Sequence, residues 1–152
     1  MASLSDLSPC TYFGDPTGLV AVGWLDAPDS YASGATPSGF VEVLGDLLER
    51  PWNPWHYAGF HTCTLCSPGE WWWLPPELNH LELGGTNLWV PGEGVVYVAP
   101  SLIIHYVHHH DYLPPQEFID AVVACPAMES AEYFAALGAV SPPLIREYLS
   151  AP

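Results

Sequence analysis

Apolar positions along the chain predict strands in its first two-thirds and helices in its last third. The short, almost wholly apolar run at residues 19–25 predicts a buried strand. Residues 39–50 place apolar side chains at helical spacing after Ser38, which is a helix-capping residue type, and Pro51 ends the predicted helix. Residues 95–98 predict another strand. The first part of the chain therefore supplies a strand, a helix and a strand.

Turns rich in glycine and proline shape the middle of the chain. Residues 81–83 and 88–90 flank the sequence Gly-Gly-Thr-Asn at 84–87, and this arrangement predicts a hairpin. A second turn at residues 91–94 leads the chain into the strand that follows. Residues 57–62 predict a short strand that runs into a pair of cysteines.

The last third of the chain has the apolar spacing and the proline breaks of successive helices. The predicted helices cover residues 100–110, 116–124, 129–137 and 143–149. Strands followed by helices predict an α+β fold, with a small antiparallel β region followed by C-terminal helices. A length of 152 residues favours a single domain over residues 1–152, with irregular structure at residues 1–11 and 150–152.

Cysteine and histidine form two pairs with the spacing of metal ligands. Cys63 and Cys66 are separated by two residues, in a turn that precedes a Pro-Gly pair. His105 and His109 occupy positions i and i+4 of a predicted helix, on one face. Thiolate and imidazole are the ligands that zinc prefers, and each spacing lets both members reach one ion. We therefore predict a zinc-type site that links the β region to the helices.

Neighbouring histidines leave alternatives for the ligand set. His61 lies two residues before Cys63, so on a strand both side chains point the same way. His61 is therefore an alternative ligand, or a residue that contacts the ligands. His108, at i+3 from the first helical histidine, could replace His109, whereas His110 is expected to point away into solvent. Iron is the alternative to zinc.

The number of protein ligands separates a structural site from a catalytic one. Four protein ligands predict a closed structural site, whereas three ligands and a water predict a metalloenzyme, in this case a metal-assisted hydrolase. The chain lacks a His-Glu-x-x-His motif and the deaminase signature, so no catalytic residue is assigned. A redox switch through Cys63 and Cys66 is a second alternative, but Pro68 and Gly69 prevent the helix that activates such a thiol.

The chain is strongly acidic because it has few bases. It has 17 acidic residues and only two basic ones, Arg50 and Arg146, for a formal net charge of −15. Nucleic acid and anionic membranes are bound through Lys and Arg, so neither is expected as a partner. The charge favours a protein partner, in particular a basic one, and the alternative is that it only keeps a tryptophan-rich chain soluble. The N-terminus has no basic region or apolar signal core, which predicts a cytoplasmic protein.

A tryptophan-rich segment and two isolated cysteines complete the candidate features. Trp71–Trp73 cannot all face one core from a strand, so we expect at least one exposed ring that could anchor a partner. The alternative is a loop that lines the core and is held by the prolines that follow. Cys10 and Cys125 are solitary, and each is interpreted as a buried small apolar side chain.

Three sequence patterns resemble those of an uncharacterised family of small bacterial proteins. They are VGWLD at residues 22–26, GFHxCxxC at residues 59–66, and APxLIxHYV followed by PPxxF within residues 99–118. The resemblance extends over roughly residues 12–125. It implies that the conserved His and Cys positions of the family include His109 and not His108, along with His61 and the other ligand candidates. No activity is established for the family, so the resemblance implies no function.

The sequence therefore predicts a small zinc-binding protein in which the metal is structural. The protein is expected to act as an acidic protein-interaction module, with the acidic surface and the tryptophan-rich segment as contact candidates. One form of such a module is an immunity or inhibitor-type protein that neutralises a basic toxin. A metalloenzyme and a redox switch are the alternatives.

Overall fold

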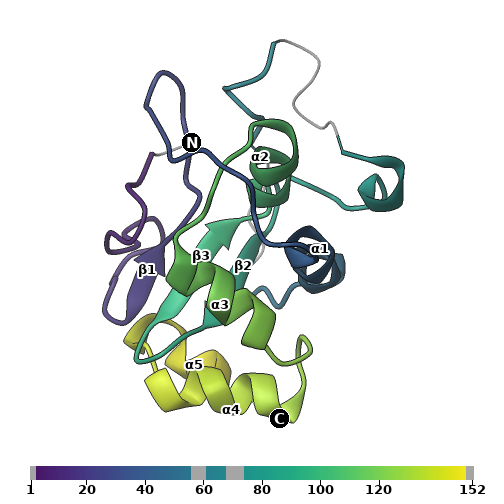
Figure 1. The fold of residues 1–152 in the computed structure, drawn as a ribbon. Coiled ribbons are helices and arrows are strands. Elements are labelled where there is room, and N and C mark those ends of the chain that lie inside the picture. Colours follow the sequence, from purple (N-terminus) through teal and green to yellow (C-terminus); the bar gives the residue numbers. More distant parts are fainter. Residues whose placement is uncertain (1–2, 56–60, 68–73, 150–152) are drawn as a thin grey trace.

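The computed structural model describes residues 3–55, 61–67 and 74–149. Two predictions lie outside these residues, namely most of the strand expected at 57–62 and the exposed segment Trp71–Trp73. Figure 1 shows a small central sheet with helices packed around it. Within the described ranges, no helix is long and apolar enough to cross a bilayer.

The sheet has three strands in the order β1–β3–β2, so β3 is central. The strands are β1 (Leu19–Ala21), β2 (Asn87–Pro91) and β3 (Val96–Pro100). β2 pairs with β3 in antiparallel orientation, as the predicted turn between them requires. β1 pairs with β3 in parallel, which differs from the antiparallel region that the sequence predicts. The long connection after β1 contains a helix and brings the chain back, so β1 and β3 run in the same direction.

The two faces of the sheet bury different clusters of side chains. Tyr97 and Ala99 of β3 belong to one apolar cluster, whereas Val96 and Val98 belong to the other. This alternation is what a strand buried on both faces produces, because successive side chains point to opposite sides. All five residues of β3 are buried. The central strand is therefore covered on both sides.

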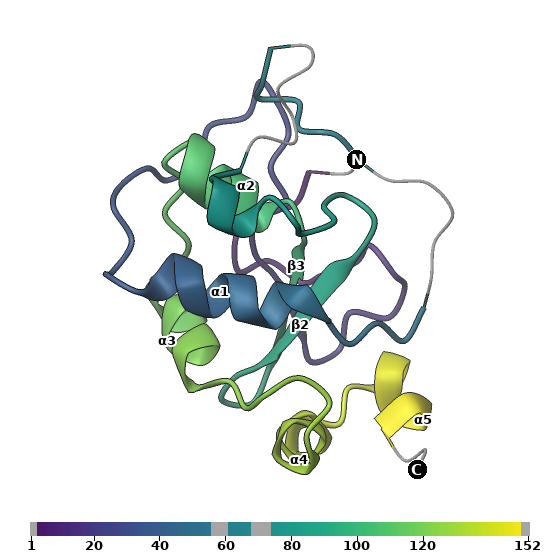
Figure 2. The ribbon, with the colours of Figure 1, turned by 90° about the vertical axis from the view of Figure 1, so that its right-hand side faces the viewer.

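Three helices contribute to the first of these clusters. They are α1 (Phe40–Glu49), α2 (Ile103–His109) and α3 (Gln116–Ala124), and they confirm the helices predicted in these regions. α1 contacts both α2 and α3, and Figure 2 shows it between them. Each helix buries an apolar face against this side of the sheet, which accounts for the helical spacing of its apolar residues.

The chain ends with helices that pack on the second cluster. They are α4 (Ala131–Val140), a 3-10 turn η2 (Pro143–Ile145) and α5 (Arg146–Leu149). Ser130 caps α4 by accepting a hydrogen bond from the Tyr133 N–H at 3.1 Å. The Tyr133 hydroxyl donates to the Trp89 carbonyl of β2 at 2.6 Å, which ties α4 to the sheet. A small sheet with helices around it confirms the predicted α+β class.

The hairpin predicted around residues 84–87 is wrong. Residues 81–86 form no strand and follow a short 3-10 turn, η1 (Pro76–Leu78). Instead, the Gly84 carbonyl accepts a hydrogen bond from the His61 N–H at 2.8 Å, and the Gly84 N–H donates to Ser101 Oγ at 2.9 Å. Gly84 has a φ of 91°, which favours glycine. The segment therefore connects the cysteine-containing loop to the start of α2.

Candidate metal centre

Four side chains from two distant segments converge on one point. The ligand atoms of Cys63, Cys66, His105 and His110 all lie within 4.8 Å of one another. Cys66 Sγ is 3.2 Å from both His105 Nε2 and His110 Nε2, and Cys63 Sγ is 3.4 Å from His110 Nε2. In tetrahedral zinc sites the sulfur–nitrogen separation is roughly 3.5 Å. A small expansion of the group accommodates one ion, and the same distances also allow thiol–imidazole hydrogen bonds.

The cysteines belong to a loop, residues 61–67, that is held at both sides by hydrogen bonds. At one side, the His61 N–H donates to the Gly84 carbonyl. At the other side, Thr64 Oγ1 donates to Asp26 Oδ1 at 2.7 Å and accepts from the Ala27 N–H at 2.9 Å. The loop therefore reaches the end of α2 with its position set by two separate parts of the chain.

The histidines come from the middle of α2 and from its end. His105 is fully buried within the helix. His110 is the C-cap, with φ −116° and ψ 11°, so its backbone has already left the helix. Asp111 follows with a φ of 54°, a left-handed conformation that aspartate tolerates better than most residues. Because the helix ends here, the His110 side chain turns back toward His105.

Contacts with residues 32–34 hold the chain that leaves α2. The Gly34 N–H donates to the Asp111 carbonyl, and the Leu113 N–H donates to the Ala32 carbonyl, both at 2.9 Å. Ser33 forms an isolated antiparallel bridge with Tyr112. This pairing replaces continued helical hydrogen bonding after His110. The position of His110 therefore depends on a part of the chain more than 70 residues away.

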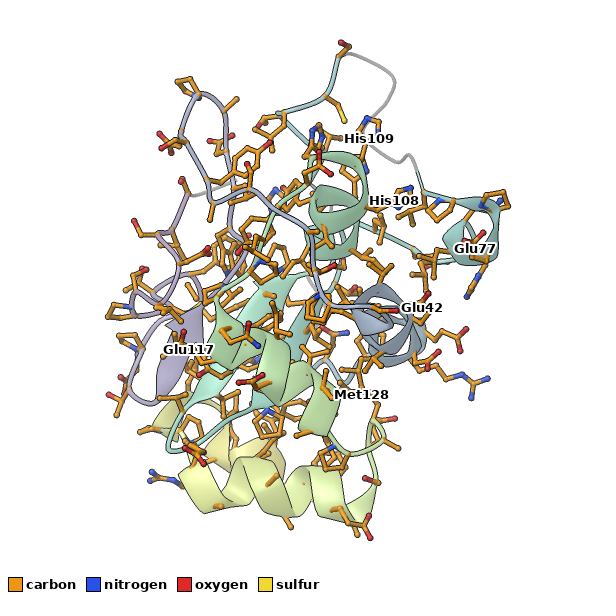
Figure 3. The ribbon with its side chains drawn as sticks, in the orientation of Figure 1. Glu42, Glu77, His108, His109, Glu117 and Met128 are labelled. Atoms are coloured by element: carbon orange, nitrogen blue, oxygen red, sulfur yellow. The ribbon has the colours of Figure 1, made fainter. Side chains whose placement is uncertain are left out.

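His109 is not in the group of four, and the prediction that His110 points away from the site is wrong. His109 is exposed, and its ring stacks on that of His105 at a centroid distance of 5.3 Å. His108 is exposed as well, and Figure 3 shows it beside α2, apart from His109 at the helix end. His105 and His109 do lie on one face of α2, as their i, i+4 spacing predicts, but the ring that reaches the cysteines belongs to His110, which lies just past the end of the helix. Asp111, a residue type tolerant of left-handed φ, is the signal that could have indicated the end.

His61 is also outside the group of four. Its Nε2 lies 3.0 Å from the Tyr12 hydroxyl, and its ring meets the Tyr12 ring edge-on at a centroid distance of 6.3 Å. Partial burial lowers the pKa of His61, which favours the neutral imidazole. The alternative role of His61 as a direct ligand is therefore not supported by the geometry. Its backbone, through Gly84, helps to fix the loop that carries the cysteines.

Tyr106 adds a buried polar atom next to the cysteines. Within the described residues, its hydroxyl is buried without a hydrogen-bond partner. Burial raises the pKa of Tyr106, and the nearby Cys63, Asp26 and Cys66 raise it further. The phenol therefore stays protonated and can donate, and a thiolate is the kind of acceptor that its surroundings offer. Thiolates bound to a metal would satisfy this hydroxyl, which fits an ion at the centre of the group.

The four side chains offer two sulfurs and two nitrogens to one point, a composition that structural zinc sites also have. Among the described residues, no carboxylate belongs to the group. Cys63 and His105 are buried, whereas Cys66 and His110 are partly exposed. Cys10 and Cys125 lie elsewhere and are free thiols, and burial raises the pKa of each to about 11. The four side chains could thus hold a metal between a loop and a helix.

Comparison with known proteins assigns no activity. A family model described as Domain of unknown function (DUF7919) matches residues 2–123. The match covers the sheet, helices α1 and α2, all but the last residue of α3, and all four residues of the candidate metal centre. Comparison with curated proteins and with solved structures finds no match.

Proposed function

This chain belongs to the DUF7919 family of domains of unknown function, and we propose that it is a zinc-binding protein whose metal is structural. The observation that carries the proposal is the convergence of Cys63, Cys66, His105 and His110, whose ligand atoms all lie within 4.8 Å of one another. Mixed sulfur and nitrogen ligands in a tetrahedral arrangement favour zinc, and iron is the alternative.

The metal would connect two parts of the chain that lie far apart in sequence. It would join the loop at residues 61–67 to α2, and thus close a chain segment of about 40 residues. Where the site does not exist in the unfolded chain, binding free energy becomes folding free energy, on the order of 10 kcal/mol for structural zinc. A metal with this role stabilises the position of the loop and needs no open coordination position.

Metal analysis of the purified protein tests this role. We expect one zinc per chain, and we expect Cys63→Ser to lose the metal and to unfold at a lower temperature than the wild type. The matched control is Cys10→Ser, because Cys10 is a buried thiol outside the group. That variant changes the same chemical group but is expected to keep the zinc. A wild-type protein that is metal-free, and whose stability is unchanged by zinc or chelators, would contradict the proposal.

Cobalt substitution separates the structural site from a catalytic one. A closed site with two sulfurs and two nitrogens predicts tetrahedral cobalt bands and sulfur-to-cobalt charge transfer that do not change when azide or cyanide is added. A metalloenzyme predicts an open position, so that the added anions change the spectrum. The redox alternative predicts a metal-free protein with a reversible disulfide between Cys63 and Cys66, which mass spectrometry after alkylation would detect.

We further propose that the metal-stabilised fold acts as an acidic module that binds a basic protein. The support for this role is the net charge of −15, with only two basic residues in the chain. Such a surface accelerates association with a basic partner and makes it sensitive to salt. An immunity or inhibitor protein for a basic toxin is one form. Co-purification with a basic partner that weakens as salt rises would support this role, and association independent of salt would contradict it.

A further inference from the structure

A cavity of ≈ 410 Å³ lies between α3 and the β2–β3 turn, and none of its lining residues belongs to the candidate metal centre. Its lining includes three acidic residues, Glu93 from the turn and Glu117 and Asp120 from α3, and no basic residue. Figure 3 labels Glu117 in front of the sheet. The volume falls within the range of small-molecule sites. The cavity therefore has room for a ligand and a strongly negative lining.

Tyr97 of β3 also lines this cavity and is an independent indication of a ligand. The side chain is only 7 % exposed, yet within the described residues its hydroxyl has no hydrogen-bond partner. The ring is held by an edge-on contact with Phe118 at a centroid distance of 5.8 Å. Burial, Glu117 and Glu93 all raise the pKa of Tyr97, so its hydroxyl stays protonated near two carboxylates.

The acidic residues are too widely spaced to hold one metal ion. Among the described residues, the only side chains grouped closely enough for an ion are those of the Cys and His centre. One oxygen of Asp120 already accepts a hydrogen bond from Gln116 Nε2 at 2.8 Å. A ligand that meets all three carboxylates must therefore present several donors in different directions.

We propose that this cavity binds the guanidinium group of an arginine-like ligand. A guanidinium is planar, always charged, and has five N–H donors that can meet separated carboxylates, whereas an ammonium is a compact point charge. The unpartnered Tyr97 hydroxyl provides a further acceptor oxygen close to Glu93 and Glu117. The inference rests on the proposed function only in that a basic partner protein is one source of the arginine. The cavity shares no residue with the candidate metal centre.

Titration of the zinc-loaded protein with N-acetyl-arginine amide, followed by NMR of ¹⁵N-labelled amides, tests the cavity. We expect saturable shifts at Gly92, Glu93 and Ala121, with a dissociation constant on the order of 1 mM for so small a ligand. The neutral isostere N-acetyl-citrulline amide should not bind, and the lysine analogue should bind several-fold more weakly. Shifts that do not saturate, or equal binding of either analogue, would overturn the guanidinium assignment.

Variants of the lining test the location. Glu117→Gln should weaken binding about fivefold, as expected for an exposed ion pair. Tyr97→Phe should weaken it about threefold, through the loss of one hydrogen bond. Glu77→Gln is the matched control, because Glu77 is exposed on η1, outside the cavity, and its change removes the same charge. If Glu77→Gln weakens binding as much as Glu117→Gln, the attraction is general and the site is overturned.

Two further ligands distinguish the source of the guanidinium. An arginine flanked by glycines in a peptide represents a protein partner, and agmatine represents a small free cation. Tighter binding of the peptide indicates a protein, tighter binding of agmatine indicates a metabolite, and either supports the cavity. Metal content is measured on the same samples. If a protein that retains zinc does not bind the arginine ligands, this inference is wrong, whereas the proposed metal site is unaffected.

Discussion

At the scale of single residues, the choice between His109 and His110 has the largest chemical consequence. The two rings are neighbours, with centroids 4.8 Å apart, but only His110 brings a nitrogen to the sulfurs of Cys63 and Cys66. His109 stacks on His105 and is exposed. His110 is therefore positioned to reach an ion between the sulfurs, whereas the His109 ring covers His105.

Replacement of each histidine by alanine distinguishes these roles. His110→Ala should lower zinc affinity by more than about 100-fold, because changes to groups that merely support a ligand already cost 10–100-fold. His109→Ala should keep an affinity close to that of the wild type. Competition with a chromophoric chelator measures both. The reverse ranking would show that His109 is the ligand.

Tyr106→Phe tests the buried hydroxyl beside the thiols. In the metal-free protein, removal of an unsatisfied buried hydroxyl should increase the free energy of unfolding by about 1 kcal/mol. In the zinc-loaded protein, removal of a donor to a thiolate should lower zinc affinity about tenfold. Urea unfolding in chelator and zinc competition give the two values. The substitution is therefore expected to stabilise the metal-free protein and to weaken zinc binding. A metal-free variant that is less stable than the wild type would show that the hydroxyl has a packing role only.

At the scale of elements, the centre depends on how the loop at residues 61–67 is attached. Gly84 lies between the loop and the start of α2, hydrogen-bonded to His61 on one side and to Ser101 on the other. A Cβ atom at Gly84 would collide with the His61 carbonyl oxygen. Close approach of two backbones therefore sets the position of the cysteines relative to the histidines.

Gly84→Ala should disturb both stability and metal binding. Its φ of 91° and the collision with His61 should together cost about 2–3 kcal/mol of unfolding free energy. Gly94→Ala is the control, because Gly94 also has a positive φ, of 70°, but has no atom within 4 Å of an added Cβ. It should cost only about 1 kcal/mol and leave zinc affinity unchanged. Urea unfolding and zinc competition measure the difference, and equal effects would contradict a role for the close approach.

At the scale of the whole molecule, the four cysteines occupy two kinds of environment. Cys10 and Cys125 lie in or against the apolar clusters, where burial raises the pKa of each to about 11. Cys63 and Cys66 face two histidines in the candidate centre. The same functional group is thus a core side chain in one place and a potential ligand in the other.

Alkylation with iodoacetamide at about pH 8 should separate the two kinds of thiol. Because the thiolate reacts, Cys10 and Cys125 with pKa values of about 11 should be nearly inert there and should react faster as the pH rises toward that value. Without metal, Cys63 and Cys66 should react first, and zinc should protect both. Mass spectrometry of peptides gives the rates. Equal labelling of Cys63 and Cys66 with and without zinc would contradict metal binding at this centre.

Local patterns were sufficient to predict most elements and the chemistry of the centre. Apolar spacing placed α1 and α3 closely, because each helix buries one face, and the turn at residues 91–94 correctly joined β2 to β3. The spacing of Cys63 and Cys66, with histidines later in the chain, was enough to predict that cysteines and histidines converge on a group that could hold a metal. These features depend on residues close in sequence, so the sequence alone contained them.

Tertiary structure decided the features that depend on distant segments. His110 replaces His109 in the group because pairing of residues 111–113 with residues 32–34 accompanies the end of α2 one residue before the last histidine. The parallel pairing of β1 and the contact of Gly84 with His61 likewise join segments far apart in the chain. Local periodicity contains no information on such contacts. The sequence by itself therefore determined the kinds of ligand, and the folded chain decided which histidine completes the centre.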